Sequence, residues 1–155
     1  MKIKIKDALR YVIILLPWLI SGIIFPYNKD FYETLKIPSF ALPGFVIGIT
    51  WLILYILISI SIYIISKKIN ILKNNDYLYI LITNYLANQL FSFAFFYLMS
   101  PFLAFVMTTI TFISSIFFFI ETKEINKKAS YFLIPYIIFS SYAFIVSLSI
   151  YIMNF

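Results

Sequence analysis

Five long apolar runs, almost free of charged side chains, dominate this chain of 155 residues. They lie near residues 8–26, 43–66, 77–98, 101–120 and 129–152. A helix of about 20 apolar residues spans a hydrocarbon core about 30 Å thick. A closed β-barrel would need alternating apolar and polar residues, whereas these runs are apolar on nearly every side. We therefore predict an all-α integral membrane protein in which residues 1–155 form one domain, a five-helix transmembrane bundle.

The cations predict the orientation of this bundle. Ten of the twelve Lys and Arg residues lie in the N-terminal segment or in the second and fourth loops: Lys2, Lys4, Lys6, Arg10, Lys67, Lys68, Lys73, Lys123, Lys127 and Lys128. With five crossings these segments share one side of the membrane. The positive-inside rule then places the N-terminus in the cytoplasm and the C-terminus outside. The net charge of +6 fits this bias and attraction to anionic lipid, and it carries no pattern typical of nucleic-acid binding.

Several kinds of chemistry are excluded by composition. The chain has no cysteine and no histidine, which removes disulfides, thiolate nucleophiles and the usual zinc and haem ligands. All charged residues lie outside the five cores or at their margins, whereas ion-coupled transporters usually carry an ionisable group within the bilayer. We expect no metal site, no required cofactor and no transporter.

The basic start followed by VIILLPWLISGIIF has an alternative interpretation as a signal peptide. It lacks a clear cleavage site of small residues, and Pro17 and Trp18 interrupt its apolar core. We therefore interpret it as an uncleaved first helix, in a bacterial cell membrane.

Polar residues within the runs mark candidate contacts. Asn84 and Asn88 lie four apart and share one helix face, which Phe91 continues. The residues alone leave two readings open for this pair: hydrogen bonds between helices, or the lining of a cavity. Ala143 and Ser147 in the fifth run let another helix or a ligand approach closely, and we favour helix packing. Gly44 and Gly48 in the second run favour close packing or a turn over dimerisation.

Residues 27–42, YNKDFYETLKIPSFAL, are too aromatic for a solvated loop. We predict a short amphipathic turn that caps the outer end of the bundle, using Phe31, Tyr32, Leu35, Ile37 and Phe40. Pro38 extends the residue before it, and Pro43 starts the next helix. Such a lid is either a gate over a cavity or a plain seal.

The chain resembles a known family. The run FYETLKIPSFALPGFVIGITWLILY, residues 31–55, is similar to the pattern of tryptophan, proline and glycine residues in the TspO/MBR family of tryptophan-rich sensory proteins and mitochondrial translocator proteins. Asn84-Tyr85 with Asn88-Gln89, and Pro135-Tyr136 with Phe139 and Ala143, extend the likeness over essentially the whole chain.

The resemblance implies a homodimer of five-helix bundles with a ligand cavity beneath the first loop. It implies a receptor or sensor that binds tetrapyrroles of the protoporphyrin IX type and other apolar molecules, including benzodiazepine-site ligands. It carries nine candidate ligand-binding residues onto this sequence: Tyr32, Pro43, Trp51, Asn84, Asn88, Phe91, Phe139, Ala143 and Ser147.

Departures from the family pattern weaken a catalytic role. Phe31, Phe40 and Phe139 stand where the family commonly has tryptophan. Some members resemble light-dependent porphyrin-degrading enzymes that depend on cavity indoles, and phenylalanine is a poorer electron donor. A slow photochemical enzyme, with Trp51 as its reactive residue, is therefore one alternative to the receptor. A membrane scaffold without its own small ligand is the other.

Overall fold

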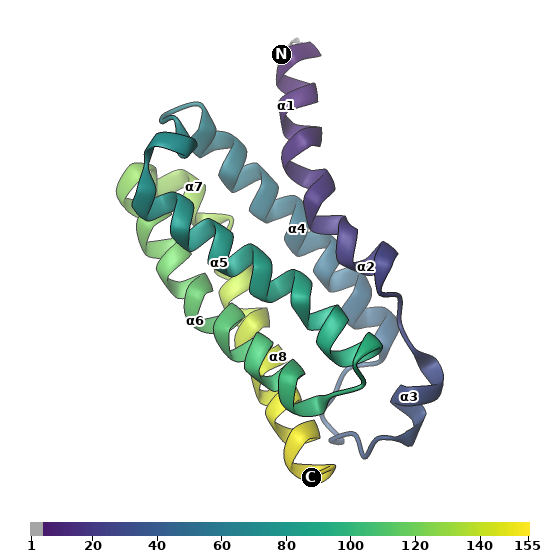
Figure 1. Cartoon of the computed structure of the whole chain (residues 1–155). Coiled ribbons are helices and arrows are strands. Elements are labelled where there is room, and N and C mark those ends of the chain that lie inside the picture. The colour runs from purple at the N-terminus through teal and green to yellow at the C-terminus, as the bar shows by residue number, and fades with distance from the viewer. Residues whose placement is uncertain (1–4) are drawn as a thin grey trace.

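The computed structural model describes residues 5–155. Long helices run side by side between the end that carries the N-terminus and the end that carries the C-terminus (Figure 1). Five segments are long and apolar enough to cross a membrane: Ile5–Ile24, Gly44–Ser66, Asn75–Tyr97, Pro101–Ile125 and Lys127–Met153. The prediction of a helical membrane protein with five spans is confirmed, although the fourth span is longer than expected.

The first span comprises α1 (Ile5–Leu15), the 3₁₀ turn η1 (Leu16–Leu19) and α2 (Ile20–Ile24). The first loop contains α3 (Lys29–Thr34), and α4 (Gly44–Ser66) is the second span. The 3₁₀ turn η2 (Ile71–Lys73) leads into α5 (Asn75–Ser92), which ends in a π-helical turn, η3 (Phe93–Tyr97). The chain continues through α6 (Pro101–Ile125), α7 (Lys127–Tyr131) and α8 (Ile134–Met153).

Polar N-caps set several helix starts. Asn28, Asn74, Ser100 and Asn126 each accept a hydrogen bond from the backbone N–H three residues later, at 3.0–3.3 Å. These bonds satisfy donors that have no partner inside the helix. Short loops between the spans therefore end at defined residues.

The kink in the first span is held by side chains of α5. Proline lacks a backbone N–H, and around Pro17 the helix tightens into η1. The Tyr85 hydroxyl donates to the Pro17 carbonyl at 3.1 Å. The Gln89 amide donates to the Trp18 carbonyl at 3.3 Å and accepts from the Ser21 N–H at 3.0 Å. Backbone polar groups in hydrocarbon need such partners, so the polar face of α5 stabilises an irregular first span.

The bundle has two unlike halves. The filled half lies near the second loop and the α6–α7 connection, and its buried cluster includes Ile58, Ile62, Ile65, Tyr77, Phe118, Leu133 and Tyr136. The hollow half lies beneath α3 and has a smaller buried cluster of Phe95, Ala104, Val146 and Ile150. The space left between its helices is the candidate site.

The first loop covers the hollow half as predicted, with one exception. Phe31, Tyr32, Leu35 and Ile37 pack against the buried cluster of that half. The Phe40 side chain does not pack there and is 52% exposed. Its predicted role in the cap is therefore wrong. Polar contacts fix the loop at two places. Asn154 accepts from the Lys36 N–H at 2.8 Å and donates to its carbonyl at 2.9 Å. The Tyr142 hydroxyl accepts from the Leu42 N–H at 2.7 Å and donates to the Phe40 carbonyl at 3.3 Å.

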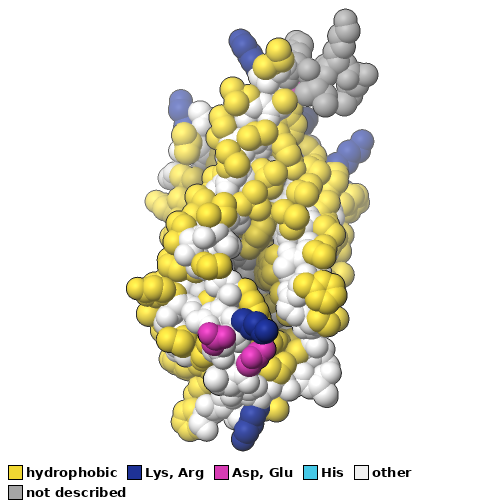
Figure 2. Space-filling view, turned by 90° about the vertical axis from the view of Figure 1, so that its right-hand side faces the viewer, with side chains coloured by type: hydrophobic (Ala, Val, Ile, Leu, Met, Phe, Trp, Pro, Cys, Tyr) yellow, Lys and Arg dark blue, Asp and Glu magenta, His cyan; other side chains and the backbone are white. Residues whose placement is uncertain are grey.

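Charged side chains gather at the ends of the molecule, and hydrophobic side chains cover its flank (Figure 2). The start of α1, the second loop and the α6–α7 connection lie at the same end (Figure 1). Lys67 joins two of these segments through a 2.9 Å ion pair with Asp7. The Tyr63 hydroxyl and then Asp7 raise the pKa of Lys67, so it is cationic at neutral pH. Lys2 and Lys4, two of the ten cations that predict the orientation, lie outside the described residues.

Candidate ligand cavity

A cavity of about 640 Å³ occupies the hollow half. Its walls come from the first span, the first loop, α4, α5 with η3, α6 and α8. The aromatic lining residues are Trp18, Tyr27, Tyr32, Phe45, Trp51, Tyr55, Phe91, Phe95, Phe96, Phe139 and Tyr142. Such a space has the size of a small-molecule site, and its wall is mostly apolar with a few polar groups.

Seven of the nine predicted site residues meet around this cavity: Tyr32, Trp51, Asn88, Phe91, Phe139, Ala143 and Ser147. They come from the first loop, α4, α5 and α8, so residues far apart in the chain converge there. Pro43 and Asn84 do not line it. Pro43 directly precedes α4, and its carbonyl accepts hydrogen bonds from the Val46 and Ile47 N–H groups.

Asn84 joins three helices instead. It is fully buried, and its amide donates to the Thr111 carbonyl at 3.2 Å and to the Ser114 hydroxyl at 2.9 Å. Its side-chain oxygen accepts from the Tyr136 hydroxyl at 2.9 Å. The interhelical reading therefore describes Asn84, in the filled half just beyond the cavity.

Asn88 fits the cavity reading. One turn closer to the first loop than Asn84, it lines the cavity, and its side-chain oxygen accepts from the Tyr55 hydroxyl at 2.8 Å and from the Gln89 amide at 3.3 Å. Asn84 therefore fits only the interhelical reading, whereas Asn88 fits both, because it lines the cavity and its bond to Tyr55 joins α5 to α4.

Both tryptophans of the chain line the cavity. Trp51 meets Phe139 edge to face at 5.5 Å between ring centroids. Tyr55 stands 5.7 Å from Trp51 and 5.7 Å from Trp18. In the sequence, Trp18 stands out only as an interruption of an apolar run. Its position beside Pro17 was the available signal, because a proline kink turns side chains that a regular helix would direct elsewhere.

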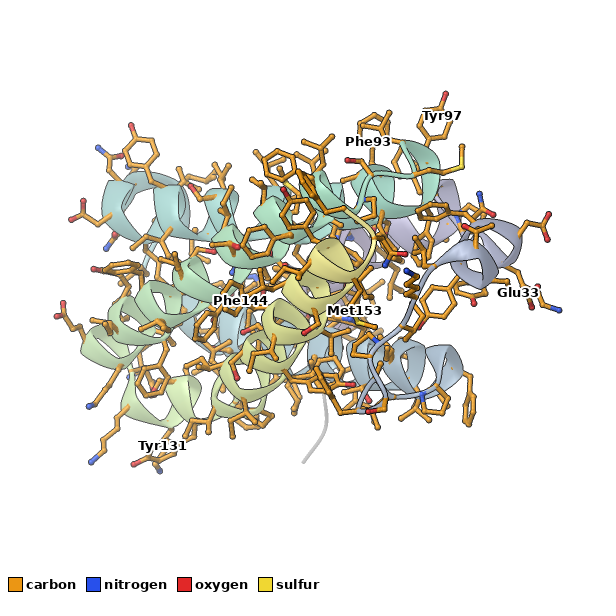
Figure 3. All side chains as sticks on the ribbon, turned by 90° about the horizontal axis from the view of Figure 1, so that it is seen from below. Glu33, Phe93, Tyr97, Tyr131, Phe144 and Met153 are labelled. Carbon is orange, nitrogen blue, oxygen red and sulfur yellow. The ribbon has the colours of Figure 1, made fainter. Side chains whose placement is uncertain are left out.

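The aromatic wall opposite α4 depends on the π-helical turn. Phe91 and Phe95 stack at 5.6 Å, and Phe95 and Phe96 both line the cavity. The wider turn of η3 lets these two consecutive residues face inward. Phe93 and Tyr97 point outward from the bundle (Figure 3). A π-turn inside an α-helix is often found at a functional site.

All three glycines of the chain line the cavity. A Cβ atom added at Gly22 or Gly48 would meet nothing within 4 Å, and one at Gly44 would meet only the Tyr27 ring, at 3.7 Å. The expectation of close helix packing at Gly48 is therefore wrong. The missing side chains widen the cavity instead.

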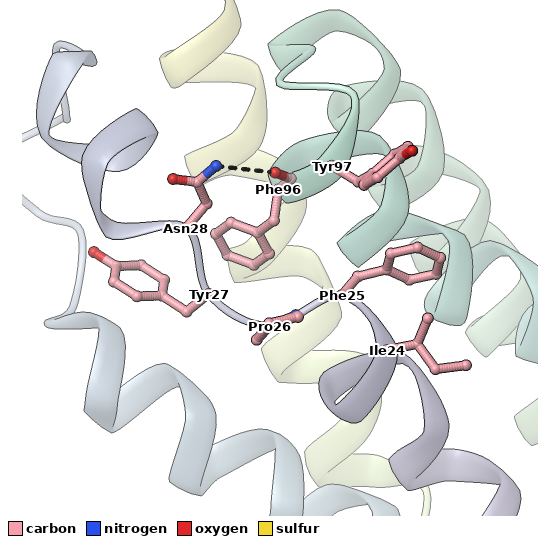
Figure 4. A pocket seen from close by; sticks show the side chains of 7 residues that line it. All are labelled: Ile24, Phe25, Pro26, Tyr27, Asn28, Phe96 and Tyr97. Carbon is pink, nitrogen blue, oxygen red and sulfur yellow. Dashed lines mark hydrogen bonds between the residues drawn. The ribbon is translucent and has the colours of Figure 1, made fainter.

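A second, smaller pocket of about 320 Å³ adjoins the cavity near the first loop (Figure 4). Tyr27 and Phe96 line both spaces, and their rings meet edge to face at 5.4 Å. Asn28 donates to the Phe96 carbonyl at 3.3 Å. This pair of rings therefore stands between the cavity and the outer pocket.

The cavity wall is uncharged. None of the described residues that line the cavity is Asp, Glu, Lys or Arg. Burial, and then the nearby Tyr27 and Tyr142 hydroxyls, raise the pKa of Tyr32 above its usual value. Tyr32 is accordingly a neutral hydroxyl at physiological pH, and the wall offers hydrogen bonds and aromatic faces without charge.

The fold and this site define a class: an integral membrane protein of five helical spans with an aromatic cavity at one end. The sequence model of the TspO/MBR family matches residues 12–153, and the chain belongs to that family. It is 31% identical over 135 residues to the tryptophan-rich protein TspO of Bacillus cereus, covering 87% of this chain and 88% of the relative. It is 33% identical over 152 residues to the uncharacterized membrane protein YtaB of Bacillus subtilis, covering 97% and 98%. Both relatives are bacterial.

Proposed function

We propose that this protein is a receptor or sensor that binds tetrapyrroles of the protoporphyrin IX type, and other flat apolar molecules, in the cavity beneath α3. The observation that carries the proposal is the cavity of about 640 Å³ with facing aromatic rings. Aromatic side chains bind flat ring systems through offset and edge-to-face contacts. TspO/MBR membership supports the proposal, because seven of the nine residues that the family resemblance implied for ligand binding line the cavity.

The lining residues have distinct proposed roles. Trp51, Phe91 and Phe139 present aromatic faces to the ligand, and Tyr32 closes the cavity from the first loop. Asn88 and Ser147 offer hydrogen bonds that orient the ligand, and Ala143 leaves room beside them. Pro43 and Asn84 act indirectly, by fixing the start of α4 and the packing beneath the cavity.

A spectral titration of the detergent-solubilised protein with protoporphyrin IX, dark and illuminated, tests the proposal. Saturable binding without bleaching supports a receptor or sensor. Loss of the Soret band under light, only when the protein is present, supports the photochemical enzyme. No saturable response contradicts both and favours a scaffold.

The photochemical alternative has one specific observation in its favour: Trp18 as well as Trp51 lines the cavity. Phe139 contacts Trp51 and stands where the family commonly has tryptophan, so a third indole is missing there. We therefore expect slow bleaching or none, and a faster rate in Phe139→Trp. Rapid bleaching by the unmodified protein that persists in Trp51→Phe would contradict this dependence on indoles.

We also propose that the first loop faces outward, that the N-terminus is cytoplasmic and that the protein is a homodimer. Asn28 and Asn74 cap helices, so the exposed Glu33 and Lys68 are better labelling sites. Glu33→Cys should react with an impermeant thiol reagent from outside intact cells, and Lys68→Cys should not. The reverse pattern would invert the orientation. Cross-linking in native membranes tests the dimer.

A further inference from the structure

Two hydroxyl groups on the α6–α8 side of the cavity have no hydrogen-bond partner. Thr111 lines the cavity and is 4% exposed, and its Oγ1 atom is buried without a partner among the described residues. Ser147 also lines it, is 7% exposed and makes no side-chain hydrogen bond within residues 5–155. Leaving a buried polar group unpaired costs about 1–3 kcal/mol.

Neighbouring hydroxyls on the same wall are satisfied. Thr108 donates to the Phe105 carbonyl at 3.0 Å. Ser140 donates to the Ile137 carbonyl at 3.0 Å and lies 3.1 Å from the Ser115 hydroxyl. Bonding back to the same helix is the usual solution for Ser and Thr in a span. Thr111 and Ser147 depart from it. Ser59, Ser61 and Thr122 are also buried without a partner in the filled half, so what sets Thr111 and Ser147 apart among the described residues is that they line the cavity.

Among residues 5–155, the same wall has no cation for an acidic ligand group. A carboxylate moved from water into this space would lose its hydration without gaining an opposite charge, which is strongly unfavourable. An ester, amide, ketone or hydroxyl loses far less and can bond to a neutral hydroxyl. The first loop, which covers this end of the bundle, carries four charged residues: Lys29, Asp30, Glu33 and Lys36.

We propose that the α6–α8 wall selects a ligand whose buried edge is uncharged and carries a hydrogen-bonding group. Ser147 is a specificity-determining residue, and Thr111 joins it when rotation of its side chain brings the buried Oγ1 atom to the cavity. This inference rests on the proposed function and defines its ligand more narrowly. A porphyrin dicarboxylic acid enters with its alkyl edge first and keeps its acidic edge at the first loop. Its neutral ester can be enclosed completely.

Three porphyrins separate charge from hydrogen bonding: protoporphyrin IX, its dimethyl ester and etioporphyrin, which carries only alkyl groups. Because both tryptophans line the cavity, quenching of their fluorescence reports occupancy directly. At pH 8 the dimethyl ester should bind about tenfold or more tightly than the diacid, since it avoids carboxylate desolvation. Thr111→Val and Ser147→Ala should each weaken ester binding about three- to tenfold and leave etioporphyrin binding unchanged.

The chain offers a matched control for each variant. Thr109 and Ser149 lie two residues away on the same helices, do not line the cavity, and bond to the Phe105 and Ile145 carbonyls. Thr109→Val and Ser149→Ala should bind all three porphyrins as the unmodified protein does. Thr111→Val should be at least as stable to heat as the unmodified protein, because it removes an unpaired hydroxyl and the Thr111 group that Asn84 uses is the backbone carbonyl.

Two results overturn the inference while leaving porphyrin binding intact. One is equal affinity for the diacid and the ester. The other is a loss in Thr111→Val that is as large for etioporphyrin as for the ester. If no porphyrin binds, the proposed function fails, and a second probe pair, acetylnaphthalene and naphthoate, decides the inference alone. Quenching by the flat ketone but not by the carboxylate supports it, and equal quenching or none overturns it.

Discussion

The filled and hollow halves of the bundle are built on the same helices, and one face of α4 shows how they differ. Near the first loop this face carries Gly44, Gly48 and Trp51, all of which line the cavity. Farther along it carries Ile58, Ile62 and Ile65, which are 0–4% exposed. Residues spaced by three and four stay on one helix face, so a single stripe changes from glycine to isoleucine. Side-chain volume along one face, rather than a change of architecture, opens the cavity.

The same contrast separates the two asparagines of α5. Asn84 and Asn88 are about 6 Å apart along the helix axis, and the boundary between the halves falls between them. Asn84 bonds to α6 and α8, whereas Asn88 bonds to Tyr55 and borders the cavity. Both asparagines therefore join helices, and Asn88 in addition contacts the ligand space.

The largest effect should follow from Asn84→Leu. The change removes three hydrogen bonds among α5, α6 and α8 and leaves the Tyr136 hydroxyl unpaired. The free energy of unfolding should fall by about 3–5 kcal/mol, given about 0.6 kcal/mol for each of the three interhelical bonds plus about 1–3 kcal/mol for the orphaned hydroxyl. Thermal unfolding in detergent measures this fall.

Asn88→Leu is the matched change in the hollow half. It should cost less stability than Asn84→Leu and more ligand affinity. If the two variants lost equal stability and equal affinity, the division of the bundle into two functional halves would be wrong.

Trp51→Ala should have the next largest effect, on affinity. The indole lines the cavity and touches Phe139. Removing it deletes aromatic contact area worth roughly 1–3 kcal/mol, or about five- to 150-fold in the dissociation constant for protoporphyrin IX. The measurement is the same spectral titration, with thermal unfolding as the check that the variant is folded. Unchanged affinity in a folded Trp51→Ala variant would mean that porphyrin does not bind in this cavity.

The sequence could predict the five spans, because a bilayer requires long uncharged helices whatever their packing. It could also predict which residues share a face, and seven of the nine candidate site residues do converge. It could not separate Asn84 from Asn88, because periodicity gives direction around a helix and not the position of a cavity along it. Trp18 and Phe96 were missed for a related reason: both reach the cavity through local departures from the regular helix, at η1 and η3.

The smallest effect, and the sharpest test of the contrast, is Gly48→Ala. A glycine within a helix is less favourable than alanine by about 1 kcal/mol, and the added Cβ would meet nothing within 4 Å. The variant should therefore be more stable by about 0.5–1 kcal/mol, yet bind the ligand more weakly, because the methyl group takes ligand space. In the filled half, removing a methyl group by Ile58→Val should instead lower stability by about 0.5–1.5 kcal/mol and leave affinity unchanged. Thermal unfolding and titration of both variants give the comparison. Destabilisation by Gly48→Ala would mean that another group packs against this glycine and that the space beside it is closed.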